Sequence, residues 1–415
     1  MEPTPAARGC VTLVAMLALA RPAHALGAGA LILVLLAAAP ASGAHAATPR
    51  KAPAGLAFYT PPRPLPAGKN GDVIWSRPAS KQASLASAAR NLTVLYRSTT
   101  TSGKPIAVSG LVAFPKGKAP KGGWPVISWS HGTTGIADAC APSRDSAASP
   151  VRPYIEYVHP VLNSWLKAGY AVVRTDFEGL GTPGIHPYLV GHSEASGAID
   201  IVRAARRLDA GVGRNWISAG HSQGGQAALF AAADGPGRAP ELRLKGVASF
   251  APASHILEQV NAAKAFTTPS GLSGLGALFV GGIDATGKAK PADILKPAAL
   301  ALYPQVDTTC LPQLTAPTSW GALAPADILR DDVDLTAARS ALAAMNPALK
   351  LKVPLLLVQG DADTTVFKPF TDQLETELAA KGDRVDYYVV KGIDHGGIVS
   401  AGLKVTTAWL KQRLR

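Results

Sequence analysis

The stretch Asn215-Trp216-Ile217-Ser218-Ala219-Gly220-His221-Ser222-Gln223-Gly224-Gly225 decides the fold of this chain. Its first half is strand-like, and residues 223–233 are rich in alanine and typical of a helix. Between them lies a match to the G-x-S-x-G nucleophile elbow, in which a serine occupies a strained turn from strand to helix. Gly220 and Gly224 have no side chains, which would collide with the backbone at such a turn. The sequence therefore predicts Ser222 as a catalytic serine, with the Gln223 N–H directed at an oxyanion.

A serine nucleophile needs a histidine base and an orienting carboxylate, which follow it in the order serine, acid, histidine. A buried-strand pattern over residues 351–360 ends at Asp361 and Asp363, and a second one over residues 384–390 ends shortly before His395. Open α/β sheets gather their site residues at the carboxyl ends of parallel strands. We expect His395 to be the base and Asp363 its partner. Asp361 stays open as the alternative, since either aspartate could also be a turn former.

An oxyanion hole takes its second N–H from the loop after the third strand of such a sheet. Residues 124–130 predict that strand, and His131-Gly132-Thr133-Thr134-Gly135 follows it. We expect Thr133 to contribute this N–H, with Thr134 left open and an ordinary glycine turn as the alternative. No other histidine follows the acid, so we expect His131 and His221 to shape loops.

The remaining strand and helix patterns predict a mostly parallel sheet. Residues 92–97 and 107–114 predict two antiparallel strands at its entry. Beyond them, strands and helices alternate, which favours right-handed crossovers between parallel strands. The expected elements are strands over 126–130, 171–176 and 244–250 and helices over 154–167 and 193–208.

Several motifs together are similar to those of the secretory lipase family of α/β-hydrolases, which includes the fungal A-type lipases and bacterial relatives. These motifs are Ser128-Trp129-Ser130-His131-Gly132-Thr133-Thr134-Gly135, Cys140-Ala141-Pro142-Ser143, Thr175-Asp176-Phe177-Glu178-Gly179-Leu180-Gly181, His186-Pro187-Tyr188-Leu189 and the elbow. The resemblance runs from about Phe58-Tyr59 to the C-terminal helix. It implies an α/β-hydrolase fold with an inserted lid, hydrolysis of carboxylic esters, and a triad of Ser222, Asp363 and His395.

The N-terminal segment has the features of a signal peptide. An apolar run over residues 31–39 precedes Ala44-His45-Ala46, an A-x-A cleavage signal, so we expect cleavage after Ala46 and a secreted or periplasmic protein. A start at Met16 and a retained N-terminal anchor are the alternatives. We assign residues 1–46 to the signal, 47–90 to a Pro-rich arm, 91–254 and 346–415 to an α/β-hydrolase core, and 255–345 to a lid or cap.

The predicted export of the protein affects how its cysteines are interpreted, because exported proteins reach an oxidising compartment. Cys10 falls inside the signal, which leaves Cys140 and Cys310. In an oxidising compartment such a pair predicts a disulfide rather than a metal site, worth about 2–5 kcal/mol. No histidine cluster accompanies these cysteines, and Gly-x-Gly-x-x-Gly is absent from the first βα turn, so we expect neither metal nor cofactor.

The long connection between the strands that end near residue 252 and begin near residue 352 exceeds the usual 2–6-residue loop plus one helix. It carries a series of apolar residues that could line an acyl tunnel or form the core of the cap itself. These residues are Phe266, Leu272, Leu275, Leu278, Phe279 and Val280.

The chain is basic, with 41 Lys and Arg against 28 Asp and Glu and a net charge of +13. Arg203, Arg206 and Arg207 share one face of a predicted helix, and we interpret them as solvated surface. We expect no nucleic-acid partner and at most a weak attraction to lipid interfaces.

The function predicted from these residues is hydrolysis of carboxylic esters, either acylglycerols or other apolar acyl esters, through an acyl-enzyme. The same triad could serve a serine peptidase or an acyltransferase. A non-catalytic secreted binding protein is a third alternative, which the complete set of site residues disfavours.

Overall fold

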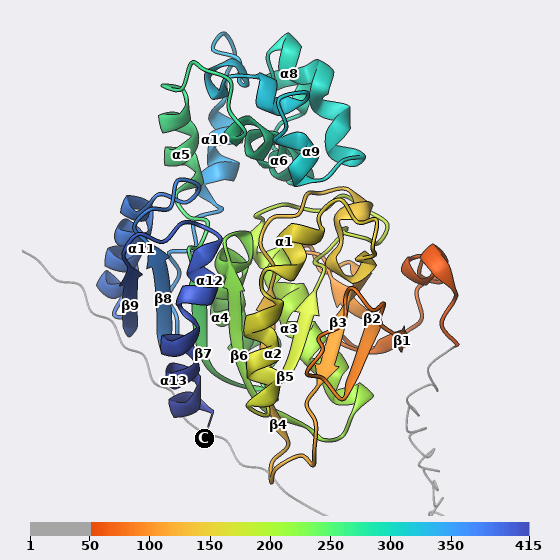
Figure 1. The fold of residues 1–415 in the computed structure, drawn as a ribbon. Coiled ribbons are helices and arrows are strands. Elements are labelled where there is room, and N and C mark those ends of the chain that lie inside the picture. The colour runs from red at the N-terminus through yellow and green to blue at the C-terminus, as the bar shows by residue number, and fades with distance from the viewer. Residues whose placement is uncertain (1–50, 415) are drawn as a thin grey trace, which may run out of the picture. The chain divides into compact units, whose positions relative to one another are not determined.

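The computed structural model describes residues 51–414, so the predicted signal peptide and its cleavage site lie outside the described residues. Within them, the strands form a nine-stranded sheet in the order β1-β2-β3-β5-β4-β6-β7-β8-β9 (Figure 1). Strands β1 to β3 are antiparallel, β3 pairs antiparallel with β5, and the strands from β5 to β9 run parallel. The strands are β1 (Val73–Pro78), β2 (Arg90–Thr99), β3 (Pro105–Phe114), β4 (Trp124–Ser130), β5 (Ala171–Thr175), β6 (Val212–His221), β7 (Arg243–Phe250), β8 (Leu355–Gly360) and β9 (Val385–Val390).

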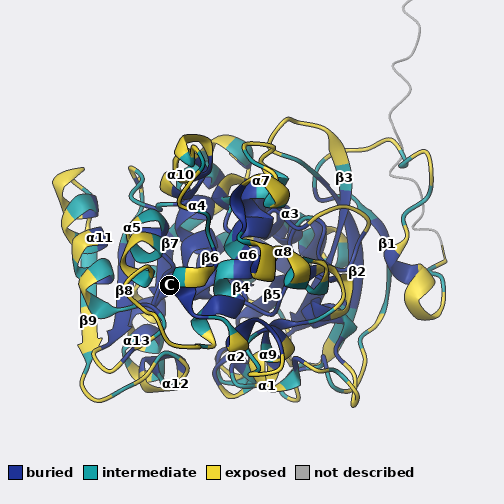
Figure 2. Ribbon diagram, turned by 90° about the horizontal axis from the view of Figure 1, so that it is seen from above, coloured by how far each residue is buried: buried dark blue, intermediate teal, exposed yellow. Residues whose placement is uncertain are grey.

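Helices cover both faces of the sheet, so its central strands are buried on both sides (Figure 2). Neighbouring residues of a strand point to opposite faces. One face carries α2 (His159–Lys167), α12 (Gly397–Ala401) and α13 (Leu403–Arg413), and the other α3 (Gly191–Leu208), α4 (Gln223–Arg238) and α11 (Lys368–Ala380). On β6, Trp216 therefore joins the apolar cluster that includes α3, while Ile217 joins the cluster that includes α2, α12 and α13.

Two elements differ from the sequence-based expectation. The helix expected over residues 154–167 is two helices, α1 (Arg152–Glu156) and α2. Pro160 has no N–H to donate to the Glu156 carbonyl, which favours a break between the two helices. Strand β1 was not predicted and lies inside the expected Pro-rich arm. It is held by packing of Trp75 against Phe58 of the 3₁₀ turn η1 (Gly55–Tyr59), which the local sequence pattern does not reveal.

The connection between β7 and β8, residues 251–354, forms a helical insertion, called here the β7–β8 insertion. It has its own apolar cluster, with Leu278, Val306 and Trp320 fully buried. Its helices are α5 (Ile256–Ala263), α6 (Leu272–Ala285), α7 (Pro291–Ile294), α8 (Pro297–Leu302), α9 (Leu311–Leu314) and α10 (Thr336–Ala343), with 3₁₀ turns η4 (Tyr303–Asp307), η5 (Trp320–Ala322) and η6 (Pro325–Asp327). Figure 1 shows these helices gathered beyond one end of the sheet strands. None of the helices in residues 51–414 has the length and apolar character that a bilayer span requires.

Candidate active site

Ser222 occupies the turn between β6 and α4 in a conformation that few non-glycine residues adopt, with φ 58° and ψ −121°. The turn is held by a hydrogen bond from the Ser222 N–H to the Phe250 carbonyl (2.9 Å). A Cβ on Gly220 would collide with the Gly224 carbonyl, and one on Gly224 would collide with the Ser130 carbonyl. The elbow therefore closes only because both glycines lack side chains.

The structure brings the serine, the histidine and one of the two aspartates into contact. The Ser222 Oγ lies 2.9 Å from Nε2 of His395, on the loop after β9, and Nδ1 of His395 lies 2.7 Å from Oδ2 of Asp363, on the loop after β8. Because a carboxylate only accepts, Nδ1 carries the proton and Nε2 is free to accept the serine proton. This arrangement can activate a hydroxyl as a nucleophile.

Asp363, rather than Asp361, is the aspartate beside His395. Its side chain is fully buried. Besides His395, it accepts hydrogen bonds from the N–H groups of Thr365 (2.8 Å) and Val366 (2.9 Å) and from Nε2 of Gln359 (3.1 Å). Asp361 accepts instead from the Gly392 N–H (2.5 Å) at an exposed position. Asp361 therefore joins the loop after β8 to the loop after β9 and does not contact His395.

His221, which the sequence predicted to shape a loop, contacts the loop that carries His395. Its Nε2–H donates to the backbone carbonyl of His395 (2.8 Å), and its Nδ1 accepts from the Tyr157 hydroxyl (2.5 Å). Burial lowers the pKa of His221 well below its ordinary value, which keeps the ring neutral as these two bonds require. His221 therefore fixes the loop that carries His395. The three residues are too far apart in sequence for a local pattern to reveal this contact.

The expected oxyanion donors are the backbone N–H groups of Gln223, next to Ser222 in the chain, and of Thr133. Gln223 begins α4, where N–H groups have no partner within the helix. Across residues 51–414, neither the Gln223 nor the Thr133 N–H has a hydrogen-bond acceptor. Thr133 lines the cavity that contains Ser222, whereas Thr134 does not and is fully buried. This placement favours Thr133 over Thr134 as the second donor.

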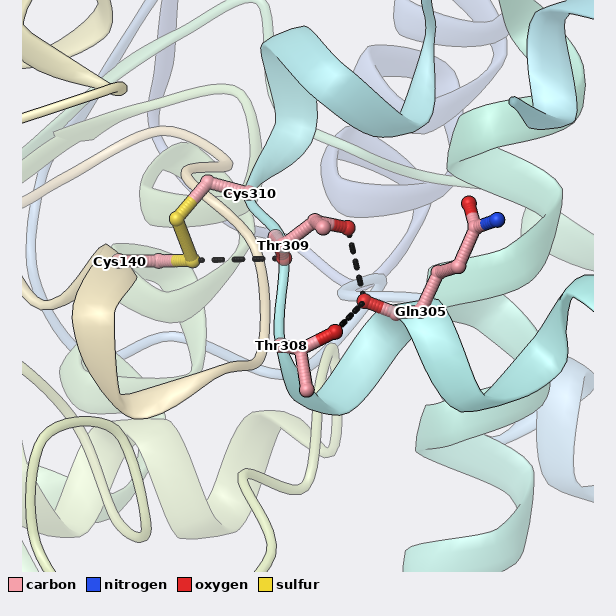
Figure 3. The surroundings of a disulfide bond; sticks show 5 residues. All are labelled: Cys140, Gln305, Thr308, Thr309 and Cys310. Carbon is pink, nitrogen blue, oxygen red and sulfur yellow. Dashed lines mark hydrogen bonds between the residues drawn. A yellow bond between two sulfur atoms is a disulfide. The ribbon is translucent and has the colours of Figure 1, made fainter. Parts of the chain in front are cut away.

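Cys140 and Cys310 form a disulfide, with their Cα atoms 5.6 Å apart (Figure 3). Cys140 ends the 3₁₀ turn η2 (Asp138–Cys140), just after the expected oxyanion loop and before η3 (Pro142–Arg144), and Cys310 precedes α9 of the β7–β8 insertion. Next to the disulfide, the Leu311 N–H donates to the Thr134 carbonyl (2.9 Å). The insertion is therefore joined, covalently and by a hydrogen bond, to the loop that carries Thr133.

A cavity of about 900 Å³ lies between the sheet and the insertion, and Ser222 and His395 are in its wall. A second, largely apolar cavity of about 420 Å³ lies within the insertion and against the loop after β8. Residues that line both cavities include Gln259, Phe266, Leu272, Leu275, Phe279 and Phe367, so the two adjoin. Of the six apolar residues singled out in the sequence, Val280 lines only the second cavity, and Leu278 lines neither and packs inside the insertion.

The site has no arrangement typical of a metal centre. Among residues 51–414, no three His, Cys, Asp or Glu side chains are grouped so that they could hold a metal ion. The backbone N–H groups of Gln223 and Thr133 beside Ser222 are hydrogen-bond donors, which suit an oxyanion.

A family model described as "Secretory lipase" matches residues 154–415. Lipase A of Moesziomyces aphidis is 28% identical over 221 residues, which are 52% of this chain and 45% of the relative, so the chain spans about half the length of this curated relative. Candida antarctica lipase A in its closed state is similar in structure, with a TM-score of 0.73 and 20% identity over 86% of this chain and 85% of that one.

The rice cell wall degrading esterase LipA of Xanthomonas oryzae is also similar, with a TM-score of 0.68 and 20% identity over 83% of this chain and 100% of that one. At these sequence identities, the similarity to the two solved structures shows the fold alone. They agree with the mostly parallel sheet and its helices, and the predicted α/β-hydrolase fold is confirmed.

Proposed function

This chain belongs to the secretory lipase family, and from that premise we propose that it is a secreted serine hydrolase that cleaves carboxylic esters. The observation that carries the proposal is the unbroken hydrogen-bonded series from Ser222 through His395 to Asp363. Secretion is supported by the family description and by the signal-peptide features of residues 1–46. The disulfide agrees with an oxidising destination.

In the proposed first half-reaction, Ser222 Oγ attacks the ester carbonyl while Nε2 of His395 takes its proton. Asp363, fixed by two backbone N–H groups, stabilises the imidazolium that forms. The N–H groups of Gln223 and Thr133 stabilise the negative charge on the former carbonyl oxygen. His395 then protonates the leaving alcohol, and an acyl group remains on Ser222.

In the second half-reaction, water takes the place of the alcohol. His395 accepts a proton from this water, which attacks the acyl-enzyme, and the same N–H groups hold the second oxyanion. Collapse of this intermediate returns the proton to Ser222 and releases the carboxylic acid. His221 supports both half-reactions, because its bond to the His395 carbonyl keeps the base within reach of Ser222.

The cavities favour an ester with an apolar acyl group over a peptide. The wall near Ser222 includes Leu272, Leu275 and Phe279, and these side chains continue into the second cavity. An extended peptide needs partners for its N–H and C=O groups, and the largely apolar second cavity offers few of them. We assign the β7–β8 insertion, which contains the expected lid over residues 255–345, as the cover of the site and its second cavity as the place of the acyl chain.

The test is hydrolysis of p-nitrophenyl esters, from acetate to palmitate, by the mature protein and its Ser222→Ala variant. We expect a rate that depends on Ser222 and falls by several orders of magnitude in the variant, while the fold is retained. An equal rate in both proteins would refute the proposal. Serine-dependent cleavage of an amide alone would indicate a peptidase, and acyl transfer to an added alcohol in preference to water an acyltransferase.

A further inference from the structure

The side chain of Gln223, the residue after the nucleophile, is buried and held from two sides behind the elbow. Its Nε2 donates to Oε1 of Glu194 (2.8 Å) and lies 3.0 Å from Nε2 of His186. Glu194 is in the first turn of α3, and His186 is in the loop before that helix. None of these contacts is used by the proposed reaction steps.

The protons of this cluster can be assigned from its acceptors. Nδ1 of His186 lies 2.8 Å from the Glu178 carbonyl, which only accepts, so Nδ1 carries a proton. Burial lowers the pKa of His186 to about 3, so the ring is neutral and its Nε2 is an acceptor. Gln223 therefore donates one amide hydrogen to His186 and the other to Glu194. Reversing its amide group would break the bond to His186, because Nε2 of that ring only accepts.

Glu194 is unusual for a carboxyl group because its side chain is fully buried, and in residues 51–414 the one basic group near it is Nε2 of the neutral His186, at 3.8 Å. Its Oε1 accepts from the Leu189 N–H (2.9 Å) as well as from Gln223, while its Oε2 has no hydrogen-bond partner in the described part of the chain. Burial raises the pKa of Glu194 to about 8, so the group is a neutral acid at neutral pH.

We infer that Glu194 is a positioning residue for the oxyanion hole, which it serves by accepting a hydrogen bond from the side chain of Gln223. This inference rests on the proposed function, in which the backbone N–H of Gln223 donates to the oxyanion. Fixing the side chain of the first residue of α4 also fixes the direction of its N–H. A preorganised donor stabilises the transition state more than one that must be reoriented.

Ionisation of Glu194 opposes the reaction for an electrostatic reason. The ionised carboxylate of Glu194 would be hydrogen-bonded to the side chain of Gln223, the residue whose backbone N–H donates to the oxyanion. Both groups are buried, so water would not screen the charge. Negative charge that develops on the substrate would then be repelled. We therefore expect kcat to fall at alkaline pH as Glu194 loses its proton.

The other titratable groups around Glu194 come from the loop before α3 and from the oxyanion loop. Burial lowers the pKa of His186 and holds that of His131 at about 4, so both stay neutral across the alkaline range. Burial raises the pKa of Tyr188, which stays protonated. Burial also raises the pKa of Glu178, which makes it the matched control.

The experiment measures kcat and KM for p-nitrophenyl butyrate between pH 6 and pH 9.5, with the Ser222→Ala rate subtracted. The variants are Glu194→Gln, which keeps an acceptor and cannot ionise, Glu194→Leu, which removes the acceptor, and Glu178→Gln. In the wild type and in Glu178→Gln, we expect kcat to fall by about tenfold or more between pH 7 and pH 9.5. In Glu194→Gln, kcat stays within about threefold of its neutral value across that range.

In Glu194→Leu, we expect kcat to be about tenfold lower at every pH with KM little changed, because only transition-state stabilisation is lost. An alkaline fall that persists in Glu194→Gln overturns the inference, and so does a wild-type kcat in Glu194→Leu. If Glu194→Leu does not fold, Glu194→Gln alone decides. A wild-type rate equal to that of Ser222→Ala would instead refute the proposed function.

Discussion

Replacement of Asp363 by Asn should nearly abolish turnover, and the contacts of the carboxylate show why. Oδ1 accepts two backbone N–H groups, so the asparagine oxygen will stay there and its NH₂ will take the place of Oδ2. That NH₂ then faces two donors, Nδ1–H of His395 and Nε2 of Gln359. Gln359 is held by its own bonds to the Gly360 and Val366 carbonyls and to Thr371, so it cannot turn away.

His395 is the group that can adapt. Its ring becomes the other tautomer, with Nδ1 as acceptor and Nε2–H directed at Ser222, and this form cannot take the serine proton. We expect kcat to fall by about 10⁴-fold, which corresponds to about 5.4 kcal/mol of transition-state stabilisation. KM should change little, because Asp363 does not line the cavity.

The assay is p-nitrophenyl butyrate hydrolysis at pH 7.5. The rate of Ser222→Ala gives the background, and circular dichroism shows whether each variant is folded. Asp361→Asn is the matched control, since it lies two residues away and contacts Gly392 rather than His395. A kcat within tenfold of wild type in Asp363→Asn would refute this reasoning. So would an equal loss in Asp361→Asn.

Four further outcomes follow from other contacts. Tyr157→Phe should lower kcat by about tenfold, the equivalent of one hydrogen bond, because His221 can then change tautomer and release the His395 carbonyl; steady-state kinetics check this. Ala263→Trp, which fills only the second cavity, should lower palmitate hydrolysis about tenfold or more and leave acetate hydrolysis unchanged. The Cys140→Ala/Cys310→Ala double variant should lose about 2–5 kcal/mol in urea unfolding. The folded state keeps the Glu194 proton to about pH 8, whereas the unfolded chain releases it near pH 4.5. The stability due to this proton is therefore complete below pH 4.5 and lost by about pH 8, at up to about 1.4 kcal/mol per pH unit, and urea unfolding of Glu194→Gln should lack this loss.

Much of the fold follows from short patterns in the chain. The elbow is readable because its G-x-S-x-G pattern lies within five residues and a Cβ on Gly220 would collide with the nearby Gly224 carbonyl. Strands β4 and β8 are mostly apolar because both of their faces are covered, and helix α3 is buried over most of its length. Strand β1 and the break between α1 and α2 were missed. The first depends on packing against a distant turn, and the second on one proline within an otherwise helical pattern.

The sequence alone also determined which residue types could form the site, and in which order, because the chemistry of a serine nucleophile limits them to few candidates. It could not show which of Asp361 and Asp363 contacts His395. It also did not reveal the contacts that His221, Tyr157 and Glu194 make around the site. Those depend on the register of parallel strands, which brings the loops after β6, β8 and β9 to one edge of the sheet. Contacts such as that between His221 and the His395 carbonyl join residues 174 apart in the chain. Such contacts form only once the strands of the sheet have assembled. Burial and hydrogen bonding between distant segments leave no period or spacing in the local sequence, so no local pattern predicts them.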